Sequence, residues 1–265
     1  MFNKPKISFY ATVPGLHLSN PIQKSVIHIP KWFKNIKPVN DEFSFPTIKT
    51  CPGFIDYFKQ GYVVSLWCDL ILDIKIINEE VNYNWSVPDK IYKFEIHSNN
   101  QFLDHTPPHI KKKTKIIFKP ICPWKIVTPK GYSVFQMPMY YNYNPIFEVL
   151  PGVLHTDVYH TINQQMCIFK EGKFIIKKGT PLATYIPFKR EEFDFEMTDN
   201  KNLEKKINAQ TTITNSTYRD KFNELKESVK LGKSVAGATS GILGFLSAGF
   251  AIYGAYKKDQ AFVNG

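Results

Sequence analysis

The chain has 265 residues, of which 43% are hydrophobic and 15% aromatic. These values exclude a globally disordered polypeptide and allow one sizeable domain with an appendage, or two small domains. The formal net charge of +11 comes mainly from lysine, because the sequence has only two arginines, Arg190 and Arg219. Arginine is the usual reader of phosphates and base edges, so we attribute the basic excess to a lysine-rich surface and expect no nucleic-acid partner.

The four cysteines are far apart, at positions 51, 68, 122 and 167. Their spacing excludes a zinc-ribbon pattern, and the sequence predicts neither a metal site nor a cofactor. The segment "MFNKPKISFYATVPG" lacks the apolar core of a secretion signal. We therefore expect reduced, mostly buried thiols in a protein that is not secreted through an N-terminal signal peptide.

Residues 1–195 have the composition of a β-rich body, with frequent prolines between β-branched and aromatic runs. We expect a first strand in "KISFYATV" and a short amphipathic turn around Trp32 and Phe33. A short helix over 53–60 should end at Gly61 and be followed by one strand from Tyr62 to about Ile77.

Two further stretches, "KIYKFEIHS" and "KTKIIFKPICPWKIVTP", predict more strands, with the prolines forming turns between them. The basic run "KKKTK" at 111–115 is expected to be a solvated loop that leads into a strand.

The composition changes at residue 196. Residues 196–216 are polar and predict a linker, and 217–233 predict an amphipathic helix with a narrow apolar stripe. Residues 234–256 carry no charge and are long enough to cross a bilayer, or to be a helix buried in an oligomer. Small residues at helical spacing favour close helix association there: Ala236, Gly237, Ser240, Gly241, Gly244 and Ala248.

Three motifs occur in order within residues 128–190: "TPKGYS", "PGVLHTDVYHTIN" and "FIIKKGTPLATYIPFKR". This stretch resembles the core of the dUTPase and dCTP deaminase superfamily, in which a "P-G-Y" strand precedes "G-V-I-D-x-D-Y" and a later strand closes the unit. The resemblance implies a mainly β fold: a β-clip (dUTPase-like) body with a C-terminal α-helical, hydrophobic extension.

The body as a whole, through "HIPKWFKNI", "TIKTCPGFIDYFKQGYVV" and "PWKIVTPKGYS", also resembles an uncharacterised protein family of tailed phages and marine bacteria. In that family the central motif is similar to "PGVVDTDTY", and a glutamine stands in the closing strand. This second resemblance implies an architecture and no particular chemistry.

The resemblance also shows where this sequence departs from a dUTPase. The nucleotide-contacting aspartate position is His155, and the closing-strand glutamine position is Thr184. An "R-S-G" helix start and a glycine-rich C-terminal arm that would hold phosphates are both absent. The remaining candidates for ligand binding are His155, Asp157, Tyr159 and Thr184.

An alternative interpretation of His155-x-Asp157 is part of an iron-binding facial triad, but no histidine follows His160 to complete it. We favour a turn retained on a scaffold without catalytic residues. In this turn Gly152 would adopt unusual backbone angles, Asp157 would accept bonds from local N–H groups, and Tyr159 would point into or across the sheet. His155 is expected to bond nearby backbone.

These patterns predict a non-enzymatic structural or interaction protein, a virion or assembly component of a phage or virus. It would form homo-oligomers and attach through its C-terminal helix to a membrane or to other virion proteins, which places it in the virion or at the host cell membrane. One alternative is a tail-anchored membrane protein with a cytoplasmic, partner-binding body. The other is a divergent nucleotide-binding enzyme of the dUTPase or dCTP deaminase type.

Overall fold

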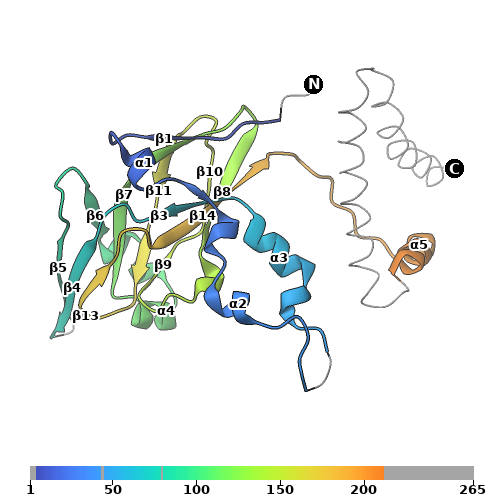
Figure 1. Cartoon of the computed structure of the whole chain (residues 1–265), viewed down its shortest axis with the longest axis horizontal. Helices are drawn as coiled ribbons and strands as arrows, with labels where there is room; N and C mark the ends of the chain where they lie inside the picture. Colours follow the sequence, from blue (N-terminus) through green and yellow to red (C-terminus); the bar gives the residue numbers. More distant parts are fainter. Residues whose placement is uncertain (1–3, 43–44, 79, 212–265) are drawn as a thin grey trace. The chain divides into compact units, whose positions relative to one another are not determined.

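The computed structural model describes residues 4–42, 45–78 and 80–211. The chain divides into two compact units, Met1–Phe193 and Asp194–Gly265. The first unit is mainly β, and its described strands form three antiparallel sheets (Figure 1). The prediction of a mainly β protein is confirmed.

The first sheet is organised around the long strand β7 (Ile116–Val127). Its strands are β1 (Ser8–Ala11), β6 (Phe94–His97), β9 (Phe147–Val149), β11 (Thr161–Asn163) and β12 (Met166–Ile168). All pair with β7 except β9, which pairs with β12 alone among the described strands.

Two prolines lie inside β7, so the expected turns between shorter strands are wrong. Pairing with β6 ends at Pro120, opposite Phe94, and pairing with β1 begins at Trp124, opposite Ala11. Pro120 and Pro123 therefore lie where β1 replaces β6 as the neighbour of β7. A missing backbone N–H costs least at such a position.

The second sheet brings the three sequence motifs together. Its order is β10 (Gly152–Leu154), β8 (Tyr132–Pro138), β14 (Pro181–Lys189), β3 (Tyr62–Ser65) and β2 (Gln23–Lys24). Strand β8 lies between β10 and β14, with Leu154 opposite Val134 and Lys189 opposite Tyr132. The end of β14 thus lies next to the turn that follows β10.

The third sheet consists of β13 (Gly172–Ile176), β4 (Leu70–Ile77) and β5 (Glu80–Ser86). The single strand expected from Tyr62 to Ile77 is wrong, because β3 and β4 belong to different sheets. The chain crosses between them at Leu66, whose N–H bonds the carbonyl of Thr180 and whose carbonyl accepts from Gly179. Leu66 and Trp67 are buried at this corner, and their burial favours the bend over one straight strand.

The core lies between the sheets and is rich in aliphatic and aromatic side chains. Fully buried members include Val64, Leu70, Leu72, Ile74, Phe118 and Ile126. Each such side chain contributes about 1.5–3 kcal/mol on burial. Cys68, Cys122 and Cys167 are buried free thiols, as expected, and desolvation raises the pKa of Cys122 to about 12. Cys51 is also a free thiol but is exposed.

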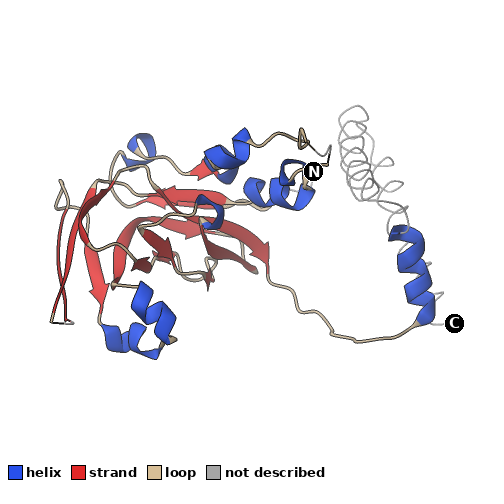
Figure 2. Cartoon of the chain, turned by 90° about the horizontal axis from the view of Figure 1, so that it is seen from below, coloured by secondary structure: helices blue, strands red, loops and turns tan. Residues whose placement is uncertain are grey.

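Short helices lie around the margins of the sheets (Figure 2). They are α1 (Leu16–Ser19), α2 (Lys31–Asn35), α3 (Pro52–Lys59) and α4 (Pro108–Lys113). The expected helix over 53–60 is confirmed as α3. The first three lysines of "KKKTK" form the last turn of α4 instead of a loop, where they complement the negative end of the helix dipole.

The described part of the second unit, residues 194–211, contains α5 (Lys201–Thr211). Its first turn is capped by the side-chain oxygen of Asn200, which accepts the N–H of Asn202 at 2.9 Å. The polar segment 196–216 thus contains a helix, because capping and good helix formers outweigh its low hydrophobicity. Among the described residues no helix is long and apolar enough to cross a bilayer. The predictions for 217–233 and 234–256 lie outside them.

The turn between α3 and β3 depends on Gly61. Its φ of +74° favours glycine, and an added Cβ would lie 2.4 Å from the carbonyl oxygen of Tyr185 in β14. We therefore expect Gly61→Ala to lower the melting temperature by about 10 °C. The matched control is Gly172→Ala, which has a φ of +86° but nothing within 4 Å of the new Cβ. Equal losses in the two variants, measured by calorimetry, would contradict the role of the close contact.

Candidate active site

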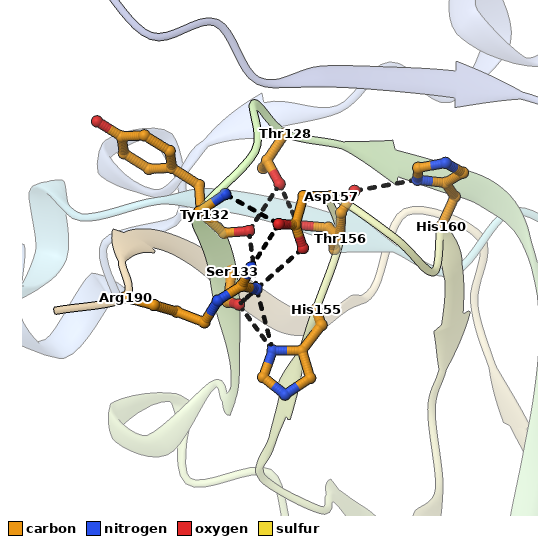
Figure 3. Close-up of polar contacts among 9 residues, drawn as sticks. Thr128, Tyr132, Ser133, His155, Thr156, Asp157, His160 and Arg190 are labelled. Carbon is orange, nitrogen blue, oxygen red and sulfur yellow. Dashed lines mark hydrogen bonds and ion pairs between the residues drawn. The ribbon is translucent and has the colours of Figure 1, made fainter. Parts of the chain in front are cut away.

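The central feature of the site is an ion pair between the end of β14 and the turn after β10 (Figure 3). Arg190 follows β14 directly, and Asp157 lies three residues beyond β10. The guanidinium binds both carboxylate oxygens: Nη1 donates to Oδ1 at 2.9 Å, and Nη2 donates to Oδ2. The Asp157 side chain is only 3% exposed, whereas that of Arg190 is 36% exposed.

A glycine turn completes the coordination of this carboxylate. The N–H of Gly131, which has a φ of +84°, donates to Asp157 Oδ2 at 2.9 Å. The carbonyl of Gly131 accepts the backbone N–H of Arg190 at 2.8 Å. One residue of the turn before β8 therefore bonds both members of the ion pair.

The ring of His155 is bound to the same arginine through a serine. Arg190 Nη1 donates to Ser133 Oγ at 2.7 Å, and Ser133 Oγ lies 2.9 Å from His155 Nδ1. Arg190 Nη1 is also 3.3 Å from His155 Nδ1. Arginine can only donate, so we assign His155 Nδ1 as the acceptor and its ring proton to Nε2.

A second set of polar contacts fixes the turn from its buried side. The Oγ1 atoms of Thr128 and Thr156 lie 2.7 Å apart, and Thr128 Oγ1 also donates to the carbonyl of Tyr132 at 3.0 Å. His160 Nδ1 lies within 3.1 Å of the carbonyls of Ile126 and Thr156, so it must carry a proton. Thr156 is fully buried. The turn is consequently held on both sides of Asp157.

The electrostatics favour a permanently ionised Asp157. The hydrogen bonds from Arg190, and next that from Gly131, hold the pKa of its carboxyl group well below the ordinary value, while the carboxylate raises the pKa of Arg190. A carboxylate stabilised in this way accepts a proton poorly and is a weak general base. The arrangement suits a structural connection better than acid–base catalysis.

The predicted residues are only partly brought together. His155 and Asp157 do lie in one cluster, and Asp157 accepts a backbone N–H as expected, that of Gly131 in the turn before β8. His155 bonds the side chains of Ser133 and Arg190, so its expected backbone bonding is wrong.

Three other expectations for the turn are corrected. Gly152 is the first residue of strand β10 and is not among the residues with positive φ, because it already has the extended backbone of the strand. Tyr159 is 52% exposed and does not point into the sheet. Thr184 lies six positions before Arg190 on β14, opposite Met137, and its hydroxyl donates to the sulfur of Met139. It therefore belongs to another part of the sheet.

Sequence reasoning missed Arg190 as a site residue. The signal was available, because Arg190 is one of two arginines in a lysine-rich chain and directly follows the closing strand. Arginine in place of lysine is typical of bidentate carboxylate binding. Ser133 and Thr128 carry no comparable signal, since isolated hydroxyl residues are common in β-rich sequences.

The described residues contain no group of three or more His, Cys, Asp or Glu side chains that could hold a metal ion. In the comparisons with known proteins, no family model matches this chain, and no curated protein matches it.

We expect Asp157→Asn to lower the melting temperature by about 5 °C at neutral pH, because it removes the charge that Arg190 and Gly131 bind. The folded pKa of Asp157 is depressed, so its stabilisation is present above the unfolded pKa of about 3.9 and is lost as the pH falls through the folded value. The difference between the wild type and the variant should therefore shrink below about pH 4.

Thermal unfolding followed by circular dichroism across this pH range measures the difference. The matched control is Asp41→Asn, which breaks the exposed ion pair with Lys37 and should have little effect. A loss in Asp157→Asn no larger than in the control would show that the buried carboxylate contributes nothing to stability.

Proposed function

We propose that the protein is a non-enzymatic structural or interaction protein, a virion or assembly component of a phage or virus. It self-associates and attaches through its C-terminal segment, in the virion or at the host cell membrane. The observation that carries this proposal is the closed ion pair in the motif that resembles a nucleotide site. Asp157 and Arg190 bind each other, and His155 is bonded to both Ser133 and Arg190.

The β-clip architecture is part of the same proposal. Strands β10, β8 and β14, which contain the three motifs, are neighbours in one antiparallel sheet. This adjacency is what a β-clip core requires. In such a core a nucleotide would have to be met by free polar groups, and here Asp157, Arg190, Ser133 and the Nδ1 atom of His155 are already paired with one another.

The proposal predicts that the chain neither hydrolyses nor binds nucleotides. Incubation with each deoxynucleoside triphosphate and Mg²⁺ should give no turnover and no thermal shift. His155→Asp, which restores the motif of the resembling enzymes, should give no nucleotide binding, because Arg190 would pair with either carboxylate. Turnover by the wild type, or a nucleotide-dependent stabilisation of His155→Asp, would favour the divergent-enzyme alternative.

Self-association is tested on the full-length chain by size exclusion with light scattering. We expect a mass above that of one chain, and the fraction of chains in the oligomer should rise with protein concentration. The same measurement with residues 234–265 removed separates the contribution of the C-terminal segment from that of the body. A strict monomer in both forms contradicts the proposal, and detergent-dependent solubility of the full-length chain alone would favour a tail-anchored protein.

A further inference from the structure

Residues 191–197 form a segment with the side-chain pattern of a strand, but they pair with no strand among the residues that the structure describes. The sequence is E-E-F-D-F-E-M, and residues 190–200 form neither helix nor strand. Phe193, Phe195 and Met197 are 86%, 86% and 84% exposed. Alternate large apolar and acidic side chains are typical of a strand with one buried face. We call residues 191–197 the arm.

The first unit carries a cleft of about 560 Å³ that is lined in part by aromatic side chains. It borders strand β9, and its lining includes Tyr140, Tyr143, Phe147, Phe169, Pro181 and Lys113. Tyr140 and Tyr143 are 60% and 64% exposed. The wall is held in place by Trp32, whose ring lies 5.8 Å from that of Tyr143 and whose Nε1 donates to the carbonyl of Tyr141 at 2.8 Å. The wall of the cleft is therefore preformed, and its lining combines aromatic with polar side chains.

Strand β9 forms part of the wall of this cleft. Among the described strands it pairs only with β12. Two bonds define the orientation of the backbone: Phe169 N–H donates to the Ile146 carbonyl, and Leu150 N–H donates to the Gln165 carbonyl. The backbone N–H and C=O groups of the even-numbered residues along β9 therefore face β12. By alternation, the peptide groups of Phe147 and Val149 face away from β12. These residues are buried, with Phe147 3% and Val149 0% exposed, and the Phe147 N–H donates to Asn144 Oδ1 at 3.4 Å, so a segment in the cleft would bind through side chains and not as an added strand.

The charges of the arm and the cleft are complementary. The arm carries Glu191, Glu192, Asp194 and Glu196, whereas α4 ends in three lysines, of which Lys113 lies at the cleft and Lys111 is paired with Asp104. Lys113 lines the cleft, with its Nζ 4.0 Å from the ring centroid of Phe169. Glu148 also lines the cleft, so we expect the acidic side chains of the arm to face α4 and not β9.

The arm is too short to occupy the cleft of its own chain. The cleft lies at the start of β14, at Pro181, and the arm leaves from the other end, where Arg190 is held by Asp157. The nine-residue strand between them spans roughly 30 Å. Phe193 is three residues past Arg190 and reaches about 11 Å at most, and Phe195 reaches about 18 Å. The two phenylalanines cannot both enter that cleft.

We propose that the arm of one copy binds in the cleft of a second copy, with its phenylalanines on the aromatic side chains of the lining and its acidic side chains toward Lys113 at the end of α4. This inference rests on the proposed self-association and names its surface. Because each chain carries both arm and cleft, mutual exchange closes a dimer, and one-way exchange builds a longer assembly. The ion pair at Arg190 fixes the point from which the arm departs.

Disulfide trapping between two differently tagged full-length chains tests the contact. Both carry Cys51→Ser, because Cys51 is the exposed thiol among the described cysteines. One chain carries Phe195→Cys in the arm, and the other carries Asn144→Cys in the cleft lining. The control replaces Asn144→Cys by Leu18→Cys, which is 78% exposed on α1. We expect about tenfold more cross-linked heterodimer with Asn144→Cys than with the control, since a disulfide needs close Cα atoms. Equal yields, or no heterodimer, would overturn the proposal.

A second measurement separates this inference from self-association in general. The arm variant Phe193→Ser, Phe195→Ser, Met197→Ser should shift the full-length chain toward monomer in light scattering, raising the dissociation constant about tenfold or more. The matched control replaces three exposed apolar residues elsewhere: Tyr10→Ser, Leu18→Ser and Val158→Ser. If the wild type and the arm variant assemble equally, self-association stands and the arm is not its surface. If the wild type is monomeric and no cross-link forms, both proposals fail.

Discussion

The structure of the site depends on one interaction, the pairing of the Arg190 guanidinium with the nearly buried carboxylate of Asp157. These residues come from two segments that are both neighbours of β8, namely the end of β14 and the turn after β10. Gly131 bonds the Asp157 carboxylate and the Arg190 backbone, so the turn before β8 is tied to the same pair. Three segments far apart in the sequence are thus joined at a single point.

This pairing explains why a motif with histidine, aspartate, serine and arginine need not be catalytic. A buried carboxylate requires a partner, and removing the partner leaves an uncompensated charge. Here the partner is bidentate, and the hydroxyl of Ser133 passes a hydrogen bond from the arginine to His155. The groups that would otherwise meet a substrate satisfy one another. The same connection holds the chain where it leaves the last strand.

Much of the local structure could be predicted from the sequence. The short helix that ends just before Gly61, the β-rich composition and the buried thiols follow from residue types and spacing. The assignment of strands to sheets could not be predicted, because the break between β3 and β4 depends on the burial of Leu66 and Trp67. The prolines of β7 were expected to form turns for the same reason. The cost of a missing backbone N–H in a strand depends on which strand lies opposite, and the sequence does not show this. The helix α5 was missed because composition alone says nothing of capping by Asn200.

The site shows the same limit. The pattern around residue 155 predicted that His155 and Asp157 would lie together, but the direction in which a side chain points is set by its tertiary partners. The resemblance placed Thr184 at the site, but five residues of strand separate it from Arg190. Arg190 itself stood out only by its rarity. Long-range pairing, which sequence spacing does not encode, decides each of these cases.

Amide hydrogen exchange at Gly131 and Arg190 tests most directly whether the ion pair holds these segments together. Both N–H groups are bonded within the cluster, to the Asp157 carboxylate and to the Gly131 carbonyl. We expect both amides to be strongly protected in the wild type and to lose most of that protection in Asp157→Asn, while amides in the centre of β7 stay unchanged. Exchange at the rate of an open chain in the wild type, or equal protection in the variant, would contradict the central role of this pair.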